Sequence, residues 1–227
     1  MGLDRETFWP SYSEDIVYPM AFRWASADPL SGPDFGILKS GVERIDSMDE
    51  ILIVRGLFFR DEKDSLAQLR ELAAHRVANA LPYFRLDRRR ILTEVDVQPI
   101  NGDVRSHPFE SIRFERLNAS SLMKTGTDTF ELCFPIKDSI AMPVILVDRL
   151  LDWLGKPNRQ KKEKIHLTGT ADGGGIAEPS DIAYERALYV KDKLVGEGWN
   201  EEQIAITTGQ RHHPLAFRNR CVVVYYE

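Results

Sequence analysis

The two halves of the chain repeat one order of predicted strands and helices, and this repetition constrains the fold more than any other feature. In the second half, an amphipathic helix is predicted because Met142, Leu146, Leu150 and Trp153 recur at helical spacing. Strand-like apolar runs surround this helix. The predicted elements have the order strand, helix, strand, helix, strand, strand and cover residues 129–136, 141–155, 164–169, 180–196, 203–208 and 220–226.

The first half has the same order of predicted elements, at residues 16–24, 34–45, 51–56, 65–81, 91–98 and 111–117. Gly56 and Gly169 close the third element of each half, and Arg76 and Arg186 lie in the fourth at nearly the same offset. A tandem duplication of one βαβαββ domain explains this pattern. Strands that alternate with helices predict the α/β class, with each sheet packed against helices. The last loop is too short for a crossover helix, so a mixed sheet is expected.

The duplication also predicts the domain boundaries. We expect an N-terminal extension at 1–15, a degenerate domain at 16–117, and a domain with a candidate ligand site at 129–227. Residues 118–128 are small and polar and lack periodic apolar positions, so they are predicted to be a linker.

Composition excludes several classes of function. The formal net charge is −5, and no aromatic residues are interleaved with the basic run at 156–164, so a nucleic-acid partner is not expected. No apolar run approaches the roughly 20 residues that span a bilayer. The N-terminus lacks a signal-peptide pattern, which leaves a cytoplasmic protein or part of a longer exported chain as alternatives. Cys133 and Cys221 lie in strand-like apolar runs and are expected to be buried thiols.

An acidic and a basic side chain flank a glycine-rich loop in the second half. Asp172 ends a predicted strand, three consecutive glycines follow it, and Arg186 lies in the next helix. A carboxylate and a guanidinium on opposite sides of one loop could hold a zwitterionic ligand, or could be two solvated surface charges. The Gly-Lys-Ser/Thr pattern of a phosphate-binding loop does not follow these glycines.

Four short motifs in the second half resemble the OmpA-like domain, a peptidoglycan-binding module also found in Pal-type lipoproteins and MotB-type stator proteins. Each motif alone has little specificity, but their order and their placement on predicted elements match the family. The resemblance covers 129–227 and, more faintly, 16–117. The motifs are Gly169-Thr170-Ala171-Asp172, Ile182-Ala183, Arg186-Ala187 and Arg218-Asn219-Arg220-Cys221-Val222.

The resemblance implies a role for each candidate site residue. Asp172 would accept the ammonium group of diaminopimelate in the peptidoglycan stem peptide, and Arg186 would bind its carboxylate. Gly173 and Gly174 would let the ligand approach bare backbone, and Arg218 would support the ligand loop.

Some positions depart from the family pattern. The family's loop asparagine falls at Pro179, so Ser180 or Asp181 would have to replace it as helix cap and ligand contact. In the first half, Phe59 stands where Asp172 is expected, although Arg76 is retained. We therefore interpret the first half as a copy that keeps the fold and has lost the ligand site.

These observations predict a non-catalytic protein of the periplasm or cell envelope that binds peptidoglycan, with an envelope protein or a second copy of the chain as further partners. No cofactor is expected. Metal binding is not expected either, because His212 and His213 have no third ligand at suitable spacing. One alternative is a structural or assembly module that has lost peptidoglycan binding. Another is a cytoplasmic enzyme that binds phosphate at the glycine loop.

Overall fold

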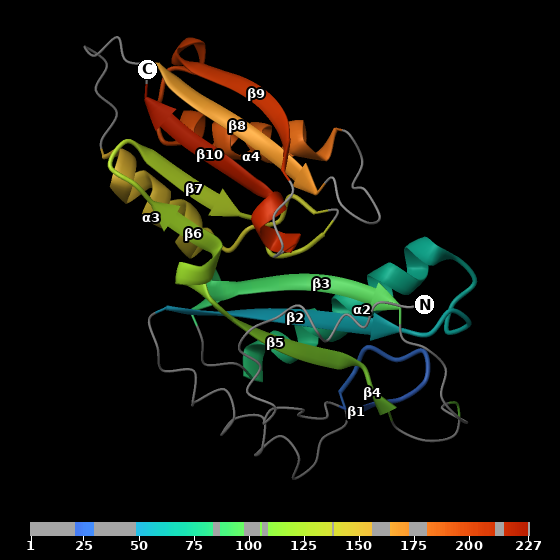
Figure 1. The fold of residues 1–227 in the computed structure, drawn as a ribbon. Helices are drawn as coiled ribbons and strands as arrows, with labels where there is room; N and C mark the ends of the chain where they lie inside the picture. Colours follow the sequence, from blue (N-terminus) through green and yellow to red (C-terminus); the bar gives the residue numbers. More distant parts are fainter. Residues whose placement is uncertain are drawn as a thin grey trace. The chain divides into compact units, whose positions relative to one another are not determined.

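The chain of the computed structural model forms two compact units (Figure 1), which we call the N-terminal unit, within Ser11–Leu117, and the C-terminal unit, within Asn118–Glu227. The predicted α/β class is confirmed, since each unit contains a β-sheet and at least one α-helix. The residues that the structure describes are 21–29, 49–83, 87–97, 105, 109–137, 139–155, 164–172, 181–211 and 216–226.

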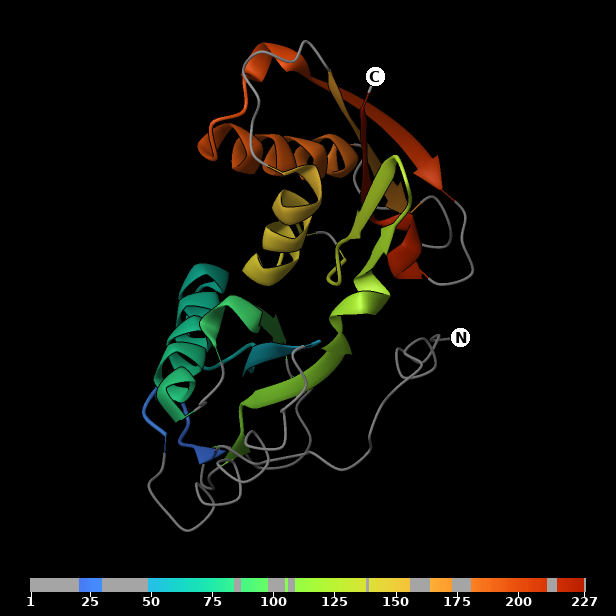
Figure 2. The same ribbon diagram turned by 90° about the vertical axis from the view of Figure 1, so that its left-hand side faces the viewer.

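The C-terminal unit contains a five-stranded sheet with the order β6-β7-β10-β8-β9. Strands β8 and β9 are parallel because α4 connects them, and the other pairs are antiparallel, as expected for a mixed sheet. Figure 2 shows α3 and α4 on one side of this sheet. The elements are β6 (Met123–Thr125), β7 (Thr129–Cys133), α3 (Val144–Leu154), β8 (Ile165–Asp172), α4 (Ile182–Gly196), β9 (Ile204–Arg211) and β10 (Cys221–Tyr226), with short 3₁₀ helices at Ala119–Leu122, Glu201–Gln203 and Ala216–Asn219.

The N-terminal unit contains a three-stranded sheet with the order β3-β2-β5, and β1 pairs with β4 beside it. Since β4 and β5 follow each other in the chain, the order β1, β4–β5, β2, β3 parallels the order β7, β10, β8, β9 of the other unit. Strands β2 and β3 are parallel and are joined through α2. The elements are β1 (Ala21–Phe22), β2 (Glu50–Phe58), α2 (Leu66–Ala80), β3 (Ile91–Val97), β4 (Phe109–Glu110) and β5 (Ile112–Asn118), with short 3₁₀ helices at Leu81–Tyr83 and Arg88–Arg90.

Two predicted strand ends are wrong. Gly56 and Gly169 do not terminate β2 and β8, which continue to Phe58 and Asp172. A glycine inside a strand can mark a close approach of another backbone rather than a turn. A Cβ atom at Gly169 would lie 1.9 Å from the carbonyl oxygen of Ala183 in α4. At Gly56, a Cβ atom would lie 2.2 Å from the carbonyl oxygen of Ala73 in α2. Each glycine therefore lets a helix pack directly on its strand.

The segment predicted as a linker has regular structure, and some other predicted elements lie outside the described residues. Ala119 and Leu122, in the segment predicted as a linker, are buried in a 3₁₀ helix, and Met123–Thr125 pairs with β7. This segment therefore belongs to the C-terminal unit. The extension 1–15, the helix predicted at 34–45 and most of the strand predicted at 16–24 lie outside the described residues.

Ala25 has a positive φ of 54°, a conformation that costs an L-residue about 1–2 kcal/mol. Glycine adopts this conformation without steric cost, although it loses more backbone entropy on folding. Ala25→Gly should therefore raise the free energy of unfolding by up to about 1 kcal/mol in urea titrations. Ala27→Gly is the matched control, since Ala27 lies two residues further along the chain without a positive φ. Equal destabilisation by both substitutions would contradict the prediction.

Candidate functional site

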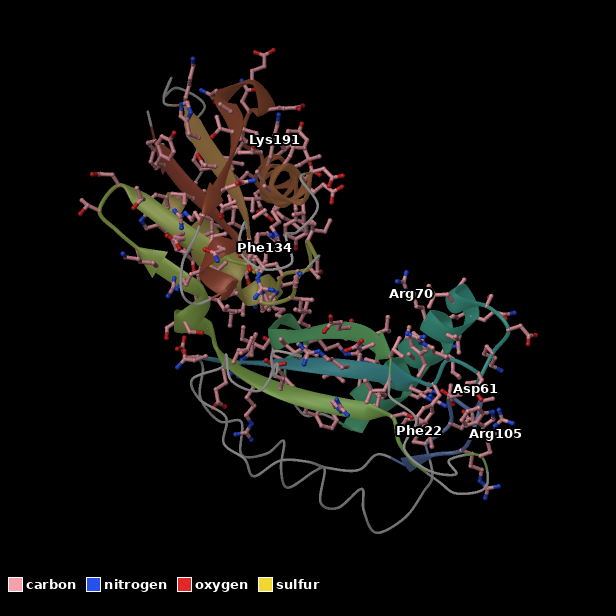
Figure 3. All side chains as sticks on the ribbon, turned by 45° about the vertical axis from the view of Figure 1, so that its right-hand side comes forward. Phe22, Asp61, Arg70, Arg105, Phe134 and Lys191 are labelled. Atoms are coloured by element: carbon pink, nitrogen blue, oxygen red, sulfur yellow. A yellow bond between two sulfur atoms is a disulfide. The ribbon has the colours of Figure 1, made fainter. Side chains whose placement is uncertain are left out.

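Arg186 is fully buried in α4, with 0% of its surface exposed. Its Nε donates a hydrogen bond to the carbonyl oxygen of Ser139 at 3.2 Å, and its Nη1 donates to the carbonyl oxygen of Thr170 at 3.3 Å. Its guanidinium carbon lies 5.3 Å from the centre of the Phe134 ring, which is labelled in Figure 3. Backbone acceptors and an aromatic face thus fix the guanidinium in position.

Asp172 is the half-buried last residue of β8. Its Oδ1 accepts a hydrogen bond of 3.1 Å from Nδ2 of Asn219, an almost completely buried residue. Asp172 lies only two residues beyond Thr170, whose carbonyl oxygen binds Arg186. A carboxylate and a guanidinium are therefore associated with the same end of β8.

The aromatic face beneath Arg186 continues to Tyr189, one turn further along α4. The rings of Phe134 and Tyr189 meet edge to face, with centroids 6.3 Å apart. Burial raises the pKa of the Tyr189 hydroxyl above its usual value, so the phenol is neutral at physiological pH. The phenol therefore adds no charge on this side of the guanidinium, and the Lys193 ammonium lies 5.3 Å from the centre of the Tyr189 ring.

Of the remaining candidate residues, only Asp181 and Arg218 lie in the part of the chain that the structure describes. Gly173, Gly174 and Ser180 lie outside the described residues. Asp181 precedes α4 and is exposed, but its side chain makes no capping hydrogen bond, so it does not act as the expected helix cap. Arg218 lies in the last 3₁₀ helix, with its Nη1 3.7 Å from Oε1 of Glu131.

Arg76 in the N-terminal unit has an acidic partner that the sequence did not predict. Phe59, which stands at the position expected for an acid, is buried and stacks on Trp24. Glu62 instead forms a fully buried ion pair with Arg76. Glu62 precedes Arg76 by 14 residues, and Asp172 precedes Arg186 by the same number. Counting back from the arginine, rather than forward from the glycine, would have identified Glu62.

Cys133 and Cys221 are buried as predicted, but they form a disulfide, so the prediction that they are thiols is wrong. Both residues are completely buried and lie opposite each other on β7 and β10. Neighbouring strands bring the two side chains together, which their separate positions in the sequence could not indicate. Glu131 lies beside the pair, but bonded cysteines offer no thiolate to a metal ion.

Comparisons with known proteins found no matching family model and no matching curated protein. Among solved structures, the chain is similar to the periplasmic domain of Helicobacter pylori MotB, with 17% identity and a TM-score of 0.37, over 46% of this chain and 77% of that chain. It is also similar to the OmpA-like domain of FopA1 from Francisella tularensis, with 16% identity and a TM-score of 0.32, over 46% and 80% of the two chains. Among the described helices, none has the length and apolarity needed to cross a bilayer.

Proposed function

We propose that the C-terminal unit is a non-catalytic module that binds the peptidoglycan stem peptide by recognising diaminopimelate. Asp172 would accept the ligand's ammonium group and Arg186 would bind its carboxylate. The observation that carries this proposal is the hydrogen bond from Arg186 to Thr170, two residues before Asp172, because it associates both charges with one end of β8. A zwitterionic ligand would neutralise both groups when it displaces water.

The two candidate ligand groups suit different halves of a zwitterion. A guanidinium can bind a carboxylate through two parallel hydrogen bonds, which an ammonium group cannot do. The carbonyl oxygens of Ser139 and Thr170 hold the Arg186 side chain in place, so less conformational entropy is lost on binding. In this proposal, Gly173 and Gly174 let the ligand approach the backbone and Arg218 supports the loop.

We also propose that the protein works in the periplasm, where binding would attach an envelope protein to the cell wall. The disulfide between Cys133 and Cys221 supports this location, because disulfides persist in oxidising compartments and are rare in the cytosol. The N-terminal unit would be a divergent tandem copy of the same domain, which its matching strand order supports.

Binding to purified sacculi should decrease at least about tenfold for Asp172→Asn, which removes the charge that binds the ammonium group, and for Arg186→Lys, which cannot form the two parallel hydrogen bonds to a carboxylate. Asp192→Asn is the matched control, since Asp192 is an exposed acid on the same helix. Circular dichroism should be used to check that each variant is folded, because Arg186 is buried.

A second comparison tests the ligand itself. Sacculi with lysine in place of diaminopimelate lack one carboxylate, so we expect them to retain the parent protein poorly. On these sacculi, Arg186→Lys should change the retention of the protein little. Equal retention of the parent and both site variants on diaminopimelate sacculi would rule out the proposal.

A second candidate function is a structural or assembly module that has lost peptidoglycan binding. The observation that favours it is the complete burial of Arg186, whose guanidinium already has backbone acceptors within the chain. In this case, light scattering would detect a stable oligomer, and the protein would not bind sacculi.

A further inference from the structure

The carboxylate of Glu62 lies in a complete set of hydrogen-bond donors. Oε2 accepts from the backbone N–H of Phe59 at 2.8 Å and from Nη1 of Arg76 at 3.0 Å. Oε1 accepts from the backbone N–H of Ala25 at 3.1 Å and from Nη2 of Arg76. Each oxygen therefore receives one guanidinium N–H and one backbone N–H. This arrangement binds a carboxylate through an arginine fork and two backbone donors.

Arg76 is held in place independently of Glu62. Its Nε donates to the carbonyl oxygen of Ser26 at 2.8 Å, and its Nη1 donates to the carbonyl oxygen of Leu57 at 2.9 Å. Its guanidinium carbon lies 5.4 Å from the centre of the Phe22 ring. Leu57 directly follows the strand glycine on which α2 packs.

Arg186 makes the same three kinds of contact in the C-terminal unit. Its Nε donates to a serine carbonyl, that of Ser139, and its Nη1 donates to Thr170, which directly follows the strand glycine. The ring of Phe134 lies beneath its guanidinium. The surroundings of Arg76 and Arg186 therefore correspond in these three contacts. In the N-terminal unit, a buried glutamate from the β2–α2 loop is bound to the arginine fork.

We propose that the N-terminal unit is a carboxylate-binding site that its own chain occupies, with Glu62 as an internal ligand of Arg76. This inference does not rest on peptidoglycan binding by the other unit. Glu62 already accepts from both terminal nitrogens of the Arg76 guanidinium, so an outside carboxylate cannot bind the fork while Glu62 is in place. Removal of the Glu62 side chain should leave the four donors in position and open the site to a small carboxylate.

The test is chemical rescue of Glu62→Ala in the full chain. An uncompensated buried guanidinium is strongly destabilising, so the melting temperature of the variant should fall by about 10 °C or more. Sodium formate or acetate should then raise it along a saturable curve, because a ligand that binds only the folded state stabilises it. Sodium chloride at equal ionic strength should not raise the melting temperature of the variant. Calorimetric titration with acetate should show one site in the variant and none in the parent.

Two further variants and one control make the result decisive. The control is Asp61→Ala, which removes the neighbouring acid, an exposed residue that pairs with Arg105 (Figure 3). Acetate should raise the melting temperature of this variant no more than that of the parent. Glu62→Gln fills the same space without charge and should also show no specific response. Glu62→Ala combined with Arg76→Met should lose the rescue.

Two results would overturn the proposal. One is an equal response of Glu62→Ala to acetate and chloride, and the other is a response to acetate that persists in the double variant. If Glu62→Ala does not fold in chloride, refolding yields in formate and in chloride are compared instead. A higher yield in formate supports the proposal, and equal yields overturn it.

Discussion

Gly169→Ala is expected to reduce the free energy of unfolding of the C-terminal unit by about 3 kcal/mol, at the upper end of the usual cost of overpacking. The added methyl group would lie 1.9 Å from the carbonyl oxygen of Ala183 and 3.1 Å from the Cβ atom of Ala187. The first of these atoms belongs to the backbone of α4, which cannot move away as the end of a flexible side chain can. The helix must therefore shift from β8.

Urea titration followed by circular dichroism measures this loss. Gly209→Ala is the matched control, because Gly209 lies in the neighbouring strand β9 and a Cβ atom there would meet nothing within 4 Å. We expect the control to change the unfolding free energy by no more than about 0.5 kcal/mol. If the two variants were equally stable, the direct packing of α4 on β8 would be wrong.

The same substitution should also affect the candidate site. Ala183 lies one turn before Arg186 on α4, so a shift of the helix would separate the guanidinium from the carbonyl oxygen of Thr170. We therefore expect Gly169→Ala to weaken retention on sacculi under conditions where it remains folded. Gly209→Ala should bind as the parent does.

Most helices and strands could be predicted from the sequence because their apolar residues follow helical or alternating periods. In α3, Leu146 and Leu150 recur at helical spacing, and both are completely buried. The strand ends could not be predicted in the same way. A glycine is equally compatible with a turn and with close helix packing, and only the position of α4 distinguishes the two at Gly169.

The candidate site was predictable only in part. Asp172 and Arg186 were identified from a motif, which specifies residue types but not burial or hydrogen-bond partners. The burial of Arg186 depends on Phe134 and on the carbonyl oxygen of Ser139, which come from a distant part of the chain. Glu62 could not be found by alignment from the strand glycine, because the spacing from this glycine to the helix arginine is 20 residues in the first half and 17 in the second, which placed Phe59 where the acid was expected.

Loss of the disulfide is expected to destabilise the C-terminal unit by about 2–5 kcal/mol. Cys133 and Cys221 are separated by 88 positions, and closure of a loop of this length restricts the unfolded chain by roughly 4–5 kcal/mol in the chain-entropy model. The bond also joins β7 to β10, so the unfolded chain keeps these strands close together. Urea titration of the Cys133→Ala, Cys221→Ala double variant should therefore show a lower midpoint than the oxidised parent.

Reduction provides the control for this prediction. When the parent is unfolded in the presence of a reductant, its urea midpoint should equal that of the double variant. The reductant should not change the midpoint of the double variant. Because both cysteines are completely buried, the folded parent should resist reduction until urea opens the sheet. Thiol titration of the denatured, non-reduced parent is the decisive measurement. Two reactive thiols per chain in protein isolated from an oxidising compartment would show that the bond does not form, and would remove its support for a periplasmic location.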